Sequence, residues 1–206
     1  QYAEFEIPPN YKMSNRHVFV SNALEFLDTT GEYYYDIQTG TIYYYSDYEL
    51  TEEVISYPTL DRLFIFHNAK YFNFMDLTVW GVDDYTLTEI GLAAGQAGSN
   101  NTGSAELKQT GFSSRSALAF YHAYHVLIQD CYFHDIGGAA IYMEGRVEDT
   151  TVTGNEIEMI GDSGIRIRGH AVSNNEFSYR SGAERVTITQ NYLHEIAQSI
   201  YNAPAL

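Results

Sequence analysis

Three acidic residues lie beside isoleucines at similar points of a repeated pattern. Asp135 and Glu195 each precede an isoleucine, and Asp162 follows one by two residues. If the repeats stack, Asp135 and Glu195 lie two units apart, at roughly 9–10 Å, with Asp162 on the unit between. Glycoside hydrolysis uses two carboxyl groups about 5–9.5 Å apart, one as acid and the other as nucleophile or base. The alternative is turn chemistry, because Asp beside Gly commonly bonds the local backbone.

A second group combines aromatic, basic and acidic residues at alternating positions of the same repeats. It comprises Tyr121, Tyr142, Glu144, Arg166, Arg168 and Tyr201. Flat rings cover the apolar faces of sugars, while Arg and Glu bind hydroxyls or a uronate. We therefore predict a sugar-binding face, with Glu144 as a further candidate for acid or base catalysis. The alternative is an ordinary solvated sheet face on which Glu144 pairs with Arg168.

These groups must be positioned by the strands of an internal repeat. Segments 125–143, 150–167 and 184–201 share alternating apolar residues, a polar bend position and a short turn, with a weaker copy at 71–81. A repeat of 24 residues without helical periodicity predicts an all-β fold, a parallel β-solenoid in which each coil closes the core of the next.

Equivalent residues of the repeat predict which side chains stack. Cys131, Asn155 and Asn191 share the bend position, and Leu77 aligns with them in the weaker copy. Asn tolerates a left-handed bend and can stack as a ladder, so both asparagines are assigned a structural role. The predicted inward stack is Leu63, Leu118, Ile141, Ile165 and Ile200. The predicted outward columns are Phe64, Ala119, Tyr142, Arg166, Tyr201 and Phe66, Tyr121, Glu144, Arg168, Ala203.

The chain divides by pattern into two regions. Residues 1–60 form an entry segment, within which 32–45 reads as a Tyr-rich hairpin around a polar turn. Residues 61–206 hold the solenoid coils, interrupted at about 81–116 by a Gly/Ser/Asn-rich excursion. The last coil is incomplete at the C-terminus, so we expect the solenoid to continue beyond Leu206.

Composition limits the partners. The 206 residues carry a formal charge of −16, which opposes binding to nucleic acid or anionic lipid and suits a neutral glycan, a basic partner or cations. No apolar run is long enough to span a membrane. A single cysteine, Cys131, excludes an internal disulfide and is predicted to be a packed, inert thiol.

Ligand motifs are sparse. The histidines lack metal-site spacing, so no cofactor and no metal site is predicted. The alternative is calcium, because the acidic surplus leaves room for a carboxylate site although the DxDxDG loop is missing. Asn100 begins a glycosylation sequon in a predicted surface loop.

The run SNALEFLDTTGEYYYDIQTGTIYYYSD at 21–47 resembles the hairpin that leads into the helix of carbohydrate-active β-helix proteins. The similarity is to glycoside hydrolase family 141 and related right-handed β-helix repeat proteins, over residues 17–206. It implies a right-handed parallel β-helix. The hairpin is typical of this architecture and not of one activity.

Three functions follow as hypotheses. The first is a secreted or cell-surface protein that binds or hydrolyses a polysaccharide, as the resemblance implies. The second is a polysaccharide lyase or epimerase, in which Arg166 and Arg168 would neutralise a uronate. The third is a non-catalytic structural or adhesive module that self-associates through its open ends.

Overall fold

The computed structural model describes residues 23–50, 55–83, 115–168, 182–199 and 205–206. The chain divides into two compact units, residues 1–55 and 56–206. In the described residues nearly all regular structure is β-strand, and the one helical element is a short 3-10 turn, η1 (Leu24–Phe26).

The first unit contains the expected hairpin. Strand β1 (Tyr33–Asp36) pairs antiparallel with β2 (Thr41–Tyr44), with Tyr33 opposite Tyr44. Asp36 organises the turn: its carboxylate accepts hydrogen bonds from the Gln38 N–H at 2.9 Å and the Thr39 hydroxyl at 2.7 Å. These bonds lower the pKa of Asp36, led by the bond from Thr39.

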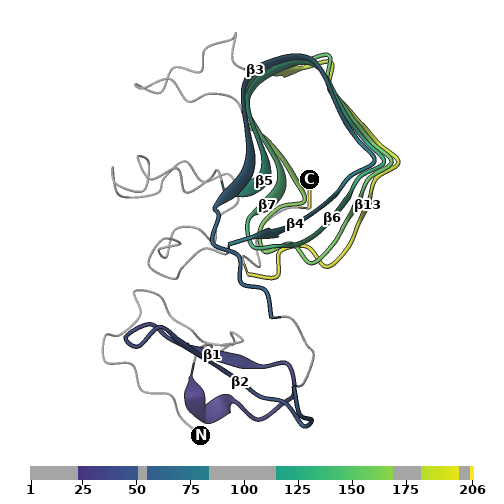
Figure 1. Cartoon of the computed structure of the whole chain (residues 1–206). Helices are drawn as coiled ribbons and strands as arrows, with labels where there is room; N and C mark the ends of the chain where they lie inside the picture. The colour runs from purple at the N-terminus through teal and green to yellow at the C-terminus, as the bar shows by residue number, and fades with distance from the viewer. Residues whose placement is uncertain (1–22, 51–54, 84–114, 169–181, 200–204) are drawn as a thin grey trace, which may run out of the picture. The chain divides into compact units, whose positions relative to one another are not determined.

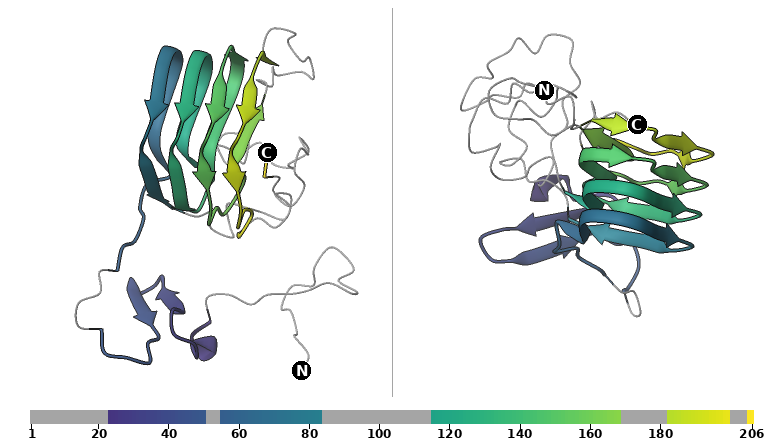
Figure 2. Two further views of the ribbon diagram at one scale, coloured as in Figure 1. Left: turned by 90° about the vertical axis from the view of Figure 1, so that its right-hand side faces the viewer. Right: turned by 90° about the horizontal axis from the view of Figure 1, so that it is seen from above.

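The second unit is a stack of parallel strands, seen along the stacking direction in Figure 1 and from two other sides in Figure 2. Its strands are β3 (Arg62–Met75), β4 (Thr78–Val82), β5 (Ser116–Gln129), β6 (Tyr132–Ile136), β7 (Ala139–Glu148), β8 (Thr151–Thr153), β9 (Glu156–Ile157), β10 (Ile165–Arg168), β11 (Ala183–Glu184), β12 (Thr187–Thr189) and β13 (Tyr192–Leu193). One sheet has the order β10-β7-β5-β8-β12, with β3 on β5 and β11 on β7; the other has the order β13-β9-β6-β4.

Every pair in these two sheets is parallel, as the repeat predicts. The long strands bend, so each coil presents three faces. We call the outward surface of residues 62–67, 116–121, 139–144 and 165–168 the first face. The second face is formed by 72–75, 126–129, 150–153 and 186–189, and the third by 78–82, 132–136, 156–160 and 192–196.

The bends fall at the same points in successive coils and use left-handed backbone conformations. The column Asp76, Asp130, Gly154 and Gln190 has φ values of 55°, 53°, 68° and 56°. A second column of positive φ consists of Tyr71, His125, Asp149 and Arg185. Asp, Asn and Gly tolerate this region best, which explains why polar residues punctuate the repeat.

The predicted inward stack is confirmed for Leu118, Ile141 and Ile165, which are consecutive in register and buried. Leu63 packs against the core, as predicted, but it does not belong to this stack, because Phe64 is the residue that pairs with Leu118. The outward columns therefore begin at Ile65 and His67, not at Phe64 and Phe66. The run LFIF is apolar at every position, so alternation could not fix its register. Ile200, Tyr201 and Ala203 lie outside the described residues.

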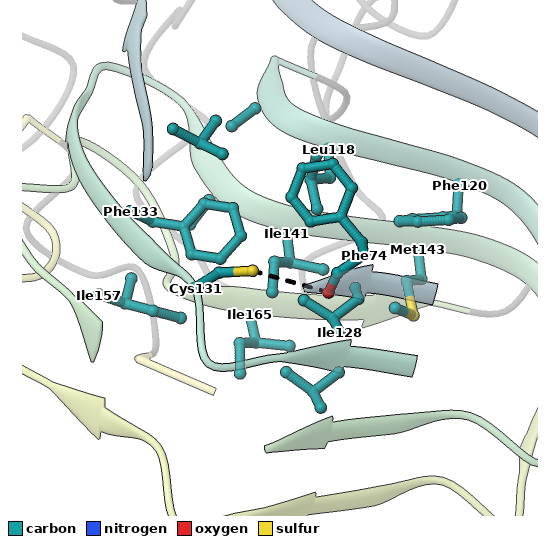
Figure 3. Packing of buried hydrophobic residues seen from close by; sticks show 14 of the residues in the cluster. Phe74, Leu118, Phe120, Ile128, Cys131, Phe133, Ile141, Met143, Ile157 and Ile165 are labelled. Atoms are coloured by element: carbon teal, nitrogen blue, oxygen red, sulfur yellow. Dashed lines mark hydrogen bonds between the residues drawn. The ribbon is translucent and has the colours of Figure 1, made fainter. Parts of the chain in front are cut away.

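The predicted Asn ladder is confirmed. Asn155 Oδ1 accepts the Cys131 N–H at 3.0 Å, and Asn191 Oδ1 accepts the Asn155 N–H at 3.0 Å. Cys131 ends the ladder and packs in the core beside Phe74, Ile128 and Phe133, with its thiol directed at the Phe74 carbonyl at 3.6 Å (Figure 3). Burial raises the pKa of Cys131, as expected for a packed thiol.

The excursion leaves the coils at Asp83 and returns at Arg115. The two side chains form an ion pair at 2.9 Å, so both ends of the inserted segment are fixed on the stack. Residues 84–114, including the sequon residue Asn100, lie outside the described residues.

Candidate functional site

The first face collects most of the predicted sugar-binding residues. Register places Ala119, Tyr142 and Arg166 in one column and Tyr121, Glu144 and Arg168 in the next. Neighbouring members of a column are separated by one strand spacing, about 4.8 Å. Residues that are 23 or 24 positions apart in the sequence are thus brought onto one small surface.

Glu144 occupies the centre of this surface. Its carboxylate is half-buried and accepts a hydrogen bond from the Tyr142 hydroxyl at 2.6 Å. A phenol that donates to a carboxylate fixes the orientation of that carboxylate, which is a requirement for both binding and proton transfer.

Tyr142 itself is fully buried, so the prediction of an exposed ring at this position is wrong. The pleat does direct it away from the core, since its neighbours Ile141 and Met143 belong to the core cluster and Tyr142 does not. Its ring meets the edge of Tyr121 at 6.4 Å between centroids. Tyr142 therefore points outward without being exposed, and its hydroxyl holds the Glu144 carboxylate.

Tyr121 is a partly accessible aromatic residue of the first face. Its ring is half-buried and stacks on His67 at 5.1 Å, with the planes 15° apart. Its hydroxyl accepts a hydrogen bond from Arg62 at 3.3 Å. The ring is therefore held by His67 through stacking and by Arg62 at its hydroxyl, which fixes its orientation.

Asp162 adds a second carboxylate beside the face. Its side chain is 4% exposed, bonds the Ser163 hydroxyl and pairs with the Arg166 guanidinium at 3.1 Å. A carboxylate this buried needs such a cation. Arg166 remains 31% exposed, so the pair reaches the surface through its arginine.

The other two predicted catalytic residues lie elsewhere. Asp135 and Glu195 occupy equivalent positions, as predicted, and Met159 occupies that position on the coil between them. All three residues have positive φ. Each precedes an isoleucine, and these isoleucines, 136, 160 and 196, are joined by β-bridges. Asp162 is not in this column, because it lies two residues beyond Ile160. Asp135 bonds the His134 ring at 2.7 Å. The structure therefore places Asp135 and Glu195 two coils apart in one column, with Asp162 on the coil between them but outside that column.

A cavity of about 490 Å³ opens where the first face bends into the next, and no sequence motif predicts it. Its polar lining residues are Asn68, Lys70, His122, Tyr124, Arg146 and Glu148. Basic groups thus gather here although the chain is acidic overall.

A β-bulge shapes this cavity. The register between β5 and β7 shifts between Tyr121 and Ala123, and the extra residue projects Arg146 outward. The Arg146 N–H donates to His122 Nδ1 at 3.0 Å, and its guanidinium bonds Glu148. Gly145 has φ of +86°, and a β-carbon there would lie 2.6 Å from the His122 ring, so only glycine fits. The sequence signal was the change of spacing, from 23 residues between Leu118 and Ile141 to 24 in the following repeats.

Ion pairs continue along the outside of this bend. Arg185 forms two bonds to Asp149, at 2.5 and 2.9 Å, from the next coil. This arginine lowers the pKa of Asp149. The side chain of Arg168, and all of Tyr201, lie outside what the structure describes.

Comparison with known proteins agrees with this architecture. The family model described as right-handed beta helix region matches residues 66–202, and the chain belongs to this family. No curated protein and no solved structure matches the chain. Among the described residues no helix has the length and apolar character needed to cross a bilayer.

Proposed function

We propose that the first face of this β-helix binds a polysaccharide, in a protein that is secreted or carried on the cell surface. The observation that carries the proposal is the arrangement of Tyr121, Glu144 and Arg166 on adjacent strands of three successive coils. The parallel crossovers are also inferred to be right-handed, in keeping with the family and with the strong preference of such connections.

The chemistry of the face matches a sugar chain. The Tyr121 ring, held by His67 and Arg62, offers an apolar plane. Glu144 and Arg166 offer an acceptor and donors beside it, which fix hydroxyl orientation. All three lie on paired strands, and rigid strands hold a binding geometry better than loops do.

Hydrolysis is the more specific activity that we propose for this face. It needs one carboxyl group to protonate the glycosidic oxygen and a second to act as nucleophile or to activate water. Glu144 and Asp162 are the two carboxylates that the structure associates with the face, through Tyr142 and Arg166 respectively. We assign Glu144 the acid/base role because it is the more accessible of the two.

A lyase or epimerase is the second candidate, favoured by the bend cavity. Lys70 and Arg146 line it beside His122, and ammonium and guanidinium groups neutralise the carboxylate of a uronate during proton abstraction. The product would decide between the two activities, because a lyase leaves an unsaturated uronate and a hydrolase does not.

A structural role is the third candidate. Within the described residues, β3 pairs only with β5 and β4 only with β6. Phe64, Ile65 and Trp80 on this coil are 43%, 49% and 51% exposed. An apolar sheet edge of this kind can pair with a second copy. Sedimentation at micromolar concentration would show dimers or fibres if this is the function, and monomers if it is not.

Affinity electrophoresis through gels containing pectin, alginate, xylan or a neutral β-glucan tests the main proposal. Retardation by one polysaccharide, lost in Tyr121→Ala, supports it. Incubation with the same panel, followed by assays for reducing ends and for unsaturated uronate, separates hydrolase from lyase. Glu144→Gln should abolish reducing-end release and leave retardation nearly intact. Migration unchanged in every gel would reject the proposal.

A further inference from the structure

The third face carries a cluster of Glu and His residues that the proposed function does not use. Glu156 and Glu158 lie on and just after β9 and alternate outward on either side of the buried Ile157. Register sets Tyr192 opposite Glu156 and places His194, on the next coil, opposite Glu158. The three side chains meet although 36 residues separate His194 from Glu158.

We propose that Glu156, Glu158 and His194 bind a divalent transition-metal cation of the zinc type. One ligand atom from each residue lies within 4.8 Å of the other two. His194 Nε2 is 3.2 Å from Glu158 Oε2 and 3.6 Å from Glu156 Oε1.

These separations suit a small cation. Tetrahedral Zn²⁺ with ligand bonds of about 2.0–2.1 Å holds its ligand atoms about 3.3 Å apart. Two of the three separations, 3.2 and 3.6 Å, bracket that value, and the third is within 4.8 Å. Ca²⁺ requires six to eight oxygen ligands at about 2.3–2.6 Å and has no preference for imidazole. One nitrogen and two carboxylates therefore favour zinc, or a similar ion, over calcium.

The imidazole supplies an independent indication. His194 Nε2 is buried and has no hydrogen-bond partner, although two carboxylates face it. A buried ring nitrogen without a bond is costly, and a metal ion in this position would satisfy it. The ring is packed against Tyr192 at 4.6 Å, which holds the nitrogen toward the glutamates.

A second layer orients the ligands. The Tyr132 hydroxyl donates to Glu158 Oε1, which leaves Oε2 directed at His194. Outer groups of this type set the orientation of metal ligands and increase affinity. Three protein ligands leave a further position of the cation open to water or to a partner.

Isothermal titration of the full chain, without an affinity tag and after chelator treatment, tests the site with Zn²⁺ alone. We expect one ion per chain, and at least tenfold weaker binding in His194→Ala and in Glu158→Gln. The matched control is His67→Ala on the first face, which should bind as the parent does. Ca²⁺ should give no comparable heat. Absence of stoichiometric Zn²⁺ binding, or equal binding by His194→Ala, would overturn the proposal.

A second readout covers variants that fail to fold. Co²⁺ added to the unaltered chain should produce the strong visible absorption of a low-coordinate site, and Zn²⁺ should displace it. Lack of that absorption also overturns the proposal, and it leaves only the direct contacts of His194 with the two glutamates. Neither measurement uses a glycan, so failure here leaves the first-face proposal untouched, and the converse also holds.

Discussion

Asn155 and Asn191 are bonded side chain to side chain: Asn155 Nδ2 donates to Asn191 Oδ1 at 2.8 Å across 36 residues of sequence. The same Asn155 amide donates to the Ile128 carbonyl, and its oxygen accepts the Cys131 N–H. One side chain therefore satisfies backbone groups of the preceding coil and joins it to the following one. Because the site residues lie in the same coils, this ladder sets the register on which the first face depends.

Asn155→Ala should destabilise the protein by roughly 2–4 kcal/mol, because it leaves several buried polar groups unbonded. Chemical denaturation followed by circular dichroism measures the change. Asn191→Ala is the matched control, and it should cost less because Asn191 is only partly buried. Equal stability of Asn155→Ala and the parent would show that the ladder does not hold the coils together.

Gly145→Ala should destabilise the protein more than the same substitution at another glycine of positive φ that has free space around it. Gly81 is the matched control: its φ is +84°, and a β-carbon there meets nothing within 4 Å. We expect Gly81→Ala to cost about 1–2 kcal/mol for backbone strain alone. Gly145→Ala should cost about 1–3 kcal/mol more, from the clash with His122. In a His122→Ala background that excess should vanish; persistence of the excess would contradict the assigned contact.

The Asp149–Arg185 pair predicts a pH effect. Arg185 lowers the pKa of Asp149 in the folded state, so the pair contributes stability above the ordinary pKa of Asp, about 3.9. That contribution is lost as the pH falls through the lowered value, because the unfolded chain takes up the proton first. Asp149→Asn keeps the left-handed bend but has no charge. The parent should therefore lose more stability than Asp149→Asn between pH 5 and pH 3. Urea unfolding at low salt measures this difference. If the free energy of unfolding of the two proteins changed in parallel with pH, the pair would not contribute to stability.

Cys131 should be almost unreactive in the folded protein. Its thiol is 3% exposed and its pKa is raised by burial, so little thiolate is available. A colourimetric thiol reagent should label it slowly at pH 8 and at once in guanidinium. Rapid labelling without denaturant would mean that the coil opens at this bend.

The repeat made the stacked strands predictable because its chemistry is local to each coil. Asn155, Asn191 and Cys131 mark one bend, and the alternation around Ile141 and Ile165 identifies the inner side. The register of the first coil was not predictable, since LFIF satisfies either pleat. The solvent exposure of an outward side chain was not predictable from the repeat either. Tyr142 follows the outward pattern and is nonetheless buried.

In the candidate sites, too, the repeat predicts some features and leaves others unpredicted. Columns on the first face followed directly from the repeat, so Tyr121, Glu144 and Arg168 were aligned correctly. The Glu158–His194 pair has the same offset of 36 residues as the predicted Asn155–Asn191 pair, but the alignment alone does not show that the two side chains meet. The bulge at Gly145 depends on one extra residue, which appears in the sequence only as a change of period.

The most direct test of the first face compares two single aromatic truncations for binding to the polysaccharide that retards the parent protein most. Tyr121→Ala removes the ring held by His67 on the first face, and Trp80→Ala removes a 51% exposed ring on the third face. We predict at least a tenfold loss of affinity for Tyr121→Ala and parent-like affinity for Trp80→Ala. Loss of binding in Trp80→Ala with full binding in Tyr121→Ala would contradict the account and move the glycan to the third face.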